Sequence, residues 1–192
     1  QGYLTYSNIL GSLAGRLSGT PFLGSFRNAG YDSARISARR AKIESFCLRH
    51  FADGVLANGY TVADFGHQRI GDDFPIDVLP NAVDAGLLPQ LTREEKQALR
   101  RELIGDVDRE LILSVGRLTP QKGFEHLLQA FAHVHEKYPK ATLVLAGSGR
   151  LLDSLTEQIR ALGLVGHAFL LGQRDDVPRL LAVADIYVNS SL

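Results

Sequence analysis

Apolar residues recur along the chain at two kinds of spacing. Spacings of three and four predict amphipathic helices, and short apolar runs between them predict strands. For the first half we expect helices over Asn8–Leu17 and Ser33–His50 and a short helix ending at Phe65, with strands over Thr20–Ser25, Gly54–Asn58 and Pro75–Leu79. Strands that alternate with helices are typical of a parallel sheet.

The second half repeats this alternation more regularly. Thr92 and Glu95 have the spacing of a capping box, which predicts a helix from there to about Leu103. The predicted elements that follow are strand Leu111–Val115, helix Lys122–Tyr138, strand Thr142–Ala146, helix Arg150–Leu162, strand Ala168–Leu171, helix Val177–Val183 and strand Ile186–Val188. Seven alternating elements in this order predict half of a Rossmann-like domain.

A break in the pattern divides the chain. Pro80–Asp84 and the region of Pro89 fit neither period, so we place a domain boundary there. The predicted fold class is α/β, with residues 1–83 and 84–192 as parts of two Rossmann-like domains with parallel sheets. Because the chain begins at Gln1, contains no methionine and ends directly after a predicted strand, we also expect it to be truncated at both ends.

Composition excludes several classes of function. The 192 residues carry 21 basic and 21 acidic side chains, so no broad positive field attracts nucleic acid. No apolar run is long enough for a membrane span, and no signal peptide is recognisable. We therefore expect a cytoplasmic protein, and leave open whether the full-length protein is peripheral to a membrane. Cys47 is the single cysteine, and we interpret it as a small buried residue and not a nucleophile.

The loop from Gly116 to Gly123 is the main candidate site. It follows the predicted strand Leu111–Val115 and leads into a helix, the place where an open α/β sheet presents its binding crevice. Arg117 offers a planar fork for two phosphate oxygens, and Lys122 adds a point charge. Gly116 allows close approach of the backbone, and Gly123 keeps the first helical turn clear. The alternative is a surface loop with a solvated Arg and Lys; the strand-loop-helix setting favours a phosphate site.

Two further loops border the same predicted crevice. Gly147 and Gly149 follow the next strand, where their N–H groups would face a phosphate or sugar hydroxyl, or the glycines form only a tight turn. Gly172 and Arg174 follow the third strand, where backbone groups would meet a base, or the arginine is simply solvated. Both alternatives stay open for both loops.

No metal site is predicted. His133 and His135 lie two apart on one predicted helix, and therefore on different faces. Asp175 and Asp176 precede a predicted helix, where negative charge favours the helix N-terminus. We expect neither a metal nor any other cofactor.

Five motifs in order carry a resemblance to a known family. They are Pro80-Asn-Ala-Val-Asp84, Gly116-Arg-Leu with Lys122-Gly123, Leu145-Ala-Gly-Ser-Gly149, Phe169-Leu-Leu-Gly172, and the segment from Leu180 through Ala184-Asp-Ile-Tyr-Val-Asn-Ser-Ser191. Together they resemble the group 1, GT4-type retaining glycosyltransferases of GT-B fold. Leu4 to Asn28 also resembles the last part of that family's acceptor-side domain.

The resemblance implies transfer of a sugar from a nucleotide-diphosphate donor to a hydroxyl of a carbohydrate or lipid-linked acceptor, with retention and without a metal. It implies that Arg117 and Lys122 hold the donor diphosphate, that Gly172 to Arg174 lie near the base, and that Asn189 to Ser191 lead to the sugar. Residues 1–83 would be the end of the acceptor-side domain, and residues 84–192 the donor-binding domain without its C-terminal part.

The sequence also departs from the family pattern. The family's Glu-x7-Glu element would start beyond Leu192, Tyr6 falls near a position where relatives often have a histidine, and Ala82 replaces a common glycine. We therefore expect this chain by itself to be inactive or nearly so. Alternatives are an epimerase or phosphorylase of the same architecture and a nucleotide-binding domain without chemistry. A NAD-dependent dehydrogenase is disfavoured because no G-x-G-x-x-G with a following acid is present.

Overall fold

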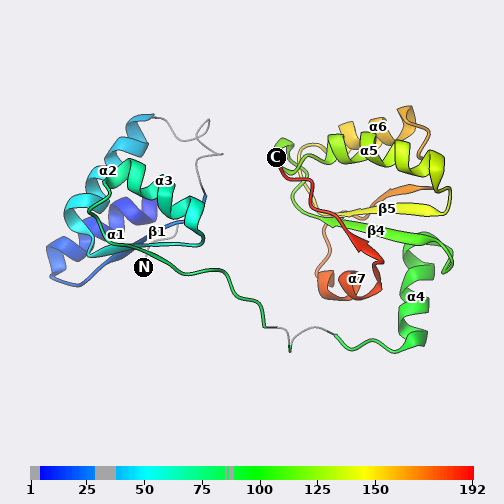
Figure 1. Cartoon of the computed structure of the whole chain (residues 1–192), viewed down its shortest axis with the longest axis horizontal. Helices are drawn as coiled ribbons and strands as arrows, with labels where there is room; N and C mark the ends of the chain where they lie inside the picture. Colours follow the sequence, from blue (N-terminus) through cyan, green and yellow to red (C-terminus); the bar gives the residue numbers. More distant parts are fainter. Residues whose placement is uncertain (1–4, 29–37, 85, 87–88) are drawn as a thin grey trace. The chain divides into compact units, whose positions relative to one another are not determined.

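The computed structural model describes residues 5–28, 38–84, 86 and 89–192. The chain divides into two compact units, Gln1–Val83 and Asp84–Leu192 (Figure 1). Each unit contains a parallel β-sheet with its own hydrophobic core, as the alternating pattern predicted. None of the helices in the described part of the chain is long and apolar enough to cross a membrane.

The first unit is a three-stranded sheet covered by helices. Its elements are α1 (Thr5–Ser18), β1 (Leu23–Phe26), α2 (Ala38–Phe51), β2 (Gly54–Ala57), α3 (Tyr60–Ile70) and β3 (Ile76–Val78). The strands pair in the order β1-β2-β3, and Figure 1 shows the three helices on the same side of the sheet. Phe26, Leu48 and Val55 are buried between them. Residues 33–37 of the predicted second helix lie outside the described residues.

Helix α1 exposes the apolar stripe that predicted it. Leu10 is 66% exposed and Leu17 is 88% exposed, whereas the buried residues of this helix are Asn8 and Ser12. The reason is close packing of the opposite face: a Cβ added to Gly11 would lie 2.2 Å from the Phe22 ring. Small and polar side chains therefore face the rest of the unit, and the leucines point away from it.

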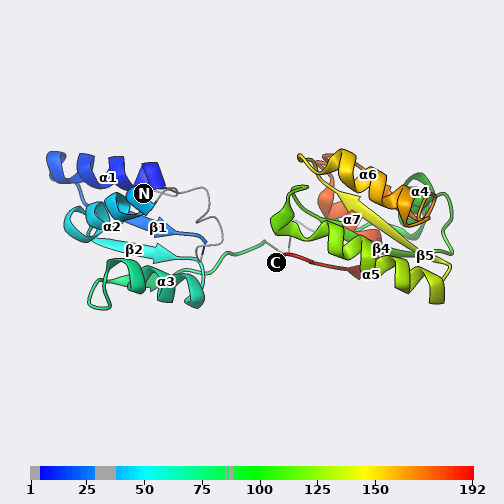
Figure 2. The same ribbon diagram turned by 90° about the horizontal axis from the view of Figure 1, so that it is seen from above.

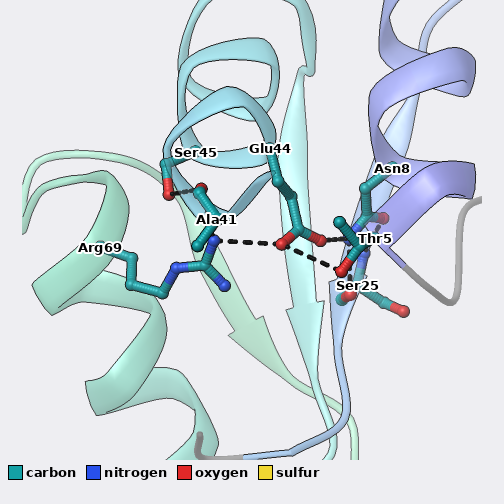
Figure 3. A network of polar contacts seen from close by, with 7 residues as sticks. All are labelled: Thr5, Asn8, Ser25, Ala41, Glu44, Ser45 and Arg69. Carbon is teal, nitrogen blue, oxygen red and sulfur yellow. Dashed lines mark hydrogen bonds and ion pairs between the residues drawn. The ribbon is translucent and has the colours of Figure 1, made fainter. Parts of the chain in front are cut away.

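A buried polar network joins the three helices to β1 (Figure 3). The Glu44 carboxylate is 2% exposed and accepts hydrogen bonds from Asn8 Nδ2 at 2.8 Å and Arg69 Nη2 at 3.1 Å. The carboxamide of Asn8 also accepts from the Ser25 N–H at 3.1 Å and donates to the Ser25 carbonyl at 3.0 Å. Helices α1 and α3 thus supply hydrogen-bond donors to the buried carboxylate of α2.

The second unit contains a four-stranded sheet between two helical layers. Its elements are α4 (Arg93–Ile104), β4 (Glu110–Val115), η2 (Pro120–Lys122, a 3-10 turn), α5 (Phe124–Lys137), β5 (Ala141–Ala146), α6 (Leu152–Ala161), β6 (Ala168–Leu170), α7 (Val177–Val183) and β7 (Ile186–Tyr187). The strands pair in parallel in the order β6-β5-β4-β7. Figure 2 shows this unit from above, with α5 and α6 over the sheet.

Two apolar clusters fix the layers of this unit. Phe124, Leu128 and Phe131 of α5 pack with Leu155 of α6 against one face of the sheet. Helices α4 and α7 cover the other face, where Leu99 and Leu180 are among the buried residues. The predicted capping box is present: Thr92 Oγ1 accepts from the Glu95 N–H at 3.2 Å, and the Glu95 carboxylate accepts from the Thr92 N–H at 2.8 Å.

Several predicted boundaries are wrong. In the first unit the helix expected to end at Phe65 continues to Ile70, the helix expected from Asn8 begins at Thr5, and the strand expected over Thr20–Ser25 is β1, Leu23–Phe26.

The helix expected from Lys122 begins at Phe124, because Gly123 has φ 62 and interrupts the path between the 3-10 turn and α5. Lys122 therefore ends the turn before the helix. The helix expected from Arg150 begins at Leu152, two residues later.

Candidate functional site

The loops that follow β4, β5, β6 and β7 meet at the carboxyl edge of the second sheet. The Leu118 N–H donates to the Ser148 carbonyl at 2.9 Å, which joins the first two loops. The Gly147 N–H donates to the Gly172 carbonyl at 2.7 Å, which joins the second and third. In open parallel sheets this edge is where ligands bind.

Three of the predicted glycines mark points of contact between these backbones. A Cβ on Gly147 would lie 1.8 Å from the Gly116 carbonyl oxygen, and one on Gly149 would lie 2.4 Å from that of Leu118. A Cβ on Gly123 would lie 2.2 Å from the carbonyl oxygen of Ser190. Gly123 therefore allows close packing against the segment after β7, in addition to the role expected for it at the helix start.

Arg117 and Lys122 lie on the same loop, between β4 and α5. Arg117 is exposed, whereas Lys122 is partly buried. The methylene carbons of Lys122 lie beside Gly116, where an added Cβ would be 3.5 Å from Cγ and Cδ of the lysine. The methylene groups of Lys122 thus pack against the backbone at Gly116, which restricts where its ammonium group can lie.

The segment after β7 holds Lys122 from the other side. Lys122 Nζ donates to Ser191 Oγ at 3.3 Å, and Ser190 Oγ donates to the Lys122 carbonyl at 2.8 Å. The Leu192 N–H donates to the Gln121 carbonyl at 3.0 Å. The resemblance placed Asn189 to Ser191 near the sugar but did not show the contact of Ser190 with Lys122, since nothing local in the sequence shows that a serine 68 residues away faces the loop.

The side chain of Arg174 is turned toward acidic neighbours. Its guanidinium donates from Nε to Asp176 Oδ1 and from Nη2 to Asp176 Oδ2, both at 2.8 Å, and its Nη2 lies 3.8 Å from Glu102 Oε1. The hydrogen bonds from Arg174 are the main reason that the pKa of Asp176 lies below its usual range. The guanidinium of Arg174 is therefore paired and not simply solvated, and contact of this loop's backbone with a base stays a prediction.

Strand β7 is fixed to the sheet by the carboxylate of the residue that precedes it. Asp185 accepts hydrogen bonds from the Leu111 N–H at 2.7 Å and from Arg100 Nη2 at 2.9 Å. Burial alone would raise the pKa of Asp185, but these hydrogen bonds outweigh it and the pKa lies below its usual value. The pairing aligns β7, and hence the serines that follow it, beside the loop of Lys122.

The predicted site residues therefore fall into two groups. Those on connected loops at this edge are Gly116, Arg117, Lys122, Gly123, Gly147, Gly149, Gly172 and Ser191. Arg174 is on one of these loops, but its guanidinium is paired with Asp176. Within the described part of the chain, no group of three or more His, Cys, Asp or Glu side chains could hold a metal ion.

Comparisons with known proteins agree on one family. The family described as Glycosyl transferases group 1 matches residues 95–192, just over half of the chain. An uncharacterised glycosyltransferase of Methanocaldococcus jannaschii is 35% identical over 60% of the chain and 28% of the relative. The Escherichia coli UDP-Gal:alpha-D-GlcNAc-diphosphoundecaprenol alpha-1,3-galactosyltransferase is 25% identical over 97% of the chain and 50% of its own length.

Solved structures of glycosyltransferases have the same fold. Anabaena HepE in complex with UDP-glucose superposes with a TM-score of 0.87 and 24% identity, over 98% of the chain and 51% of HepE. WaaG, a glycosyltransferase involved in lipopolysaccharide biosynthesis, gives a TM-score of 0.67 and 16% identity, over 89% of the chain and 51% of WaaG. The expected GT-B-like α/β fold is thus confirmed, and the chain spans about a quarter to a half of the length of these proteins.

Proposed function

Because the chain belongs to the group 1 glycosyltransferase family, we propose that residues 84–192 bind the nucleoside-diphosphate part of a sugar donor. The whole protein would transfer that sugar to a hydroxyl of a carbohydrate or lipid-linked acceptor. Residues 1–83 would belong to the acceptor-side domain. The chain spans half of HepE, so we assign transfer to the whole protein and expect this chain alone to be inactive or nearly so.

One observation carries the proposal: Arg117 and Lys122 lie on a single loop at the carboxyl edge of the second sheet, where three other loops meet it. Two cations from one short loop suit a diphosphate, which has several charged oxygens within a few ångströms of each other. The guanidinium would bind two oxygens side by side, and the ammonium would add a compact charge.

The proposed chemistry is stabilisation of a leaving group. As the bond between the anomeric carbon and the diphosphate breaks, negative charge grows on the departing oxygens. Cations already positioned there lower the energy of the transition state more than that of the bound donor. Arg117 and Lys122 would thus serve where other enzymes use a metal. We propose retention of the anomeric configuration, as in GT4-type relatives.

UDP is the first donor nucleotide to test. HepE was crystallised with UDP-glucose, and the E. coli relative is named for UDP-Gal. Binding of UDP to this chain would be measured by calorimetry, together with GDP and ADP. We expect Arg117→Ala or Lys122→Ala to weaken binding by about 10- to 100-fold, or roughly 1.5 to 3 kcal/mol, as for a hydrogen bond to a charged group.

Lys137→Ala is the matched control, since Lys137 is an exposed lysine at the far end of α5. It should leave the affinity unchanged. We call Arg117 and Lys122 together the diphosphate clamp. If neither Arg117→Ala nor Lys122→Ala weakens nucleotide binding, the proposed clamp is wrong. Product analysis with the whole protein separates the remaining alternatives: transfer to an acceptor supports the proposal, sugar isomerisation or phosphorolysis indicates the related enzymes, and binding without product indicates a non-catalytic domain.

A further inference from the structure

The Lys122 ammonium group takes part in a series of hydrogen bonds with the segment that follows β7. Ser191 Oγ accepts from Lys122 Nζ at 3.3 Å and donates to Asn189 Oδ1 at 2.8 Å. The Ser191 N–H also donates to Asn189 Oδ1, at 3.2 Å. Asn189, Ser191 and Lys122 are therefore connected in series.

The direction of these bonds gives Asn189 a specific role. A serine hydroxyl has one proton and two lone pairs. Because Asn189 Oδ1 takes the proton, the lone pairs of Ser191 are left to face the ammonium, which only donates. Without Asn189 the hydroxyl would be free to rotate, and in some orientations its proton would point at the positive charge of Lys122.

The geometry points to Asn189 as a positioning residue for Lys122, acting through the hydroxyl of Ser191. This inference rests on the proposed function, since it concerns the same diphosphate site. Asn189 would not touch the donor; it would hold one of the two cations where the diphosphate is expected. A positioned cation is more effective than a mobile one because less reorganisation accompanies binding.

Hydrogen bonds to the loop of Lys122 and to β4 hold the segment from Val188 to Leu192 in place. Ser190 Oγ donates to the Lys122 carbonyl at 2.8 Å, and the Leu192 N–H donates to the Gln121 carbonyl at 3.0 Å. Ser114 Oγ donates to the Val188 carbonyl at 2.7 Å, which fixes the start of the segment to β4. The segment from Val188 to Leu192 therefore has a defined path beside the lysine, and Asn189 is held at a fixed distance from the loop.

The first test measures UDP affinity in a double-mutant cycle. Asn189→Ala and Ser191→Val should each weaken binding by about 3- to 10-fold, the effect of one ordinary hydrogen bond. Ser191→Thr, which keeps the hydroxyl and matches valine in shape, should restore it. In a Lys122→Ala background, Asn189→Ala should cause no further loss, because its effect passes through the lysine. Ser154→Ala, which removes an exposed hydroxyl on α6, is the control.

The outcomes separate this inference from the proposed function. If Lys122→Ala weakens UDP binding but Asn189→Ala does not, or if Asn189→Ala weakens it equally in both backgrounds, the positioning role is wrong and the clamp stands. If the wild-type chain binds UDP no better than Lys122→Ala does, Lys122 does not bind the diphosphate and the positioning role of Asn189 is wrong; if Arg117→Ala also leaves the affinity unchanged, the proposed function is wrong.

A second measurement needs no ligand. The side-chain ammonium signal of Lys122 in ¹⁵N-resolved NMR spectra, identified by its loss in Lys122→Ala, should shift in Asn189→Ala and Ser191→Val. It should not shift in Ser154→Ala or Ser191→Thr. An unchanged signal in Asn189→Ala would overturn the inference whatever the affinities show.

Discussion

At the scale of single residues, the glycines of the candidate site are explained by contacts between loops. Gly147 has φ 149, and a Cβ there would lie 1.8 Å from the Gly116 carbonyl oxygen. Sequence reasoning left open whether Gly147 and Gly149 face a ligand or only form a turn. The structure adds a third reason, since both allow one backbone to touch another.

We therefore expect Gly147→Ala to destabilise the second unit strongly. The new methyl group would overlap the backbone carbonyl of Gly116, so we expect a loss on the order of 3 kcal/mol. Gly163→Ala is the control, because Gly163 has φ 68 but nothing within 4 Å of an added Cβ. It should cost only about 1 kcal/mol. Urea unfolding followed by circular dichroism would compare the two, and equal losses would contradict the contact argument.

The buried carboxylate of Glu44 gives a second prediction at this scale. Arg69→Leu would remove its cationic partner, whose side chain is only 16% exposed, and leave the carboxylate without a counter-charge. We expect a loss of about 3 kcal/mol in the free energy of unfolding, as for breaking a buried pair. Adding Glu44→Gln to Arg69→Leu should recover part of that loss, because the charge is then gone from both sides.

Arg49→Leu is the comparison for this prediction, since it breaks the exposed Arg49–Asp73 pair of the same unit. Solvent screens that pair, so the variant should cost much less than Arg69→Leu. Equal effects of Arg49→Leu and Arg69→Leu would indicate that burial adds nothing to the Glu44 interaction.

At the scale of secondary-structure elements, two neighbouring histidines and an arginine connect α5 to the residues just before β4 and β6, at the amino edge of the second sheet. The rings of His135 and His167 are 4.0 Å apart, and Arg109 Nη2 donates to His167 Nδ1 at 2.6 Å. Because Arg109 only donates, His167 accepts through an unprotonated nitrogen. Burial, and then the neighbouring His135 and Arg109, lower the pKa of His167.

This arrangement predicts a loss of stability in acid. A histidine whose folded-state pKa is lowered binds fewer protons when folded, so its contribution is present above the ordinary histidine pKa of about 6.5 and is lost as the pH falls below it. We expect unfolding free energies measured from pH 7.5 to 5 to fall less steeply in His167→Gln than in the wild type. His133→Gln, which replaces an exposed histidine of α5, should not change the slope.

The helices and strands of the second unit were largely predictable from the sequence, but the contacts between them were not. Apolar spacing, with the Thr92–Glu95 capping box, located every strand and α-helix of the second unit to within a few residues, because the helices and strands pack apolar faces together. It placed the start of α5 at Lys122 because periodicity continues through the 3-10 turn, and only the backbone angle of Gly123 separates the two. The partners of Lys122 could not be predicted, since they are brought together by the pairing of β4 with β7.

At the scale of the whole molecule, helix α1 exposes a row of large apolar side chains. Four exposed apolar side chains follow one another along the helix at steps of four, three and four residues. They are Tyr6 (59% exposed), Leu10 (66%), Leu13 (37%) and Leu17 (88%). This is the spacing of a helix-packing seam. The sequence predicted a helical stripe of Ile9, Leu10, Leu13 and Leu17, but not that glycines on the opposite face would turn its leucines outward.

We therefore expect the isolated chain to self-associate through α1. Light scattering after size-exclusion chromatography should show a concentration-dependent increase in mass for the wild type. The variant Leu10→Lys/Leu17→Lys should stay monomeric, because a charge would have to be buried in the seam. Leu152→Lys, which changes an exposed leucine of α6, should behave as the wild type. A monomeric wild type at every concentration would contradict the prediction.

The carboxamide of Asn8 has a consequence for how such association proceeds. It pairs with both the N–H and the C=O of Ser25, in β1, which is an edge strand among the described strands of this sheet. The carboxamide therefore takes the place of a neighbouring strand's peptide group, and it occupies the backbone groups with which a strand of another chain would pair. Removing that amide would open a route to amyloid-like stacking that the leucines of α1 do not provide.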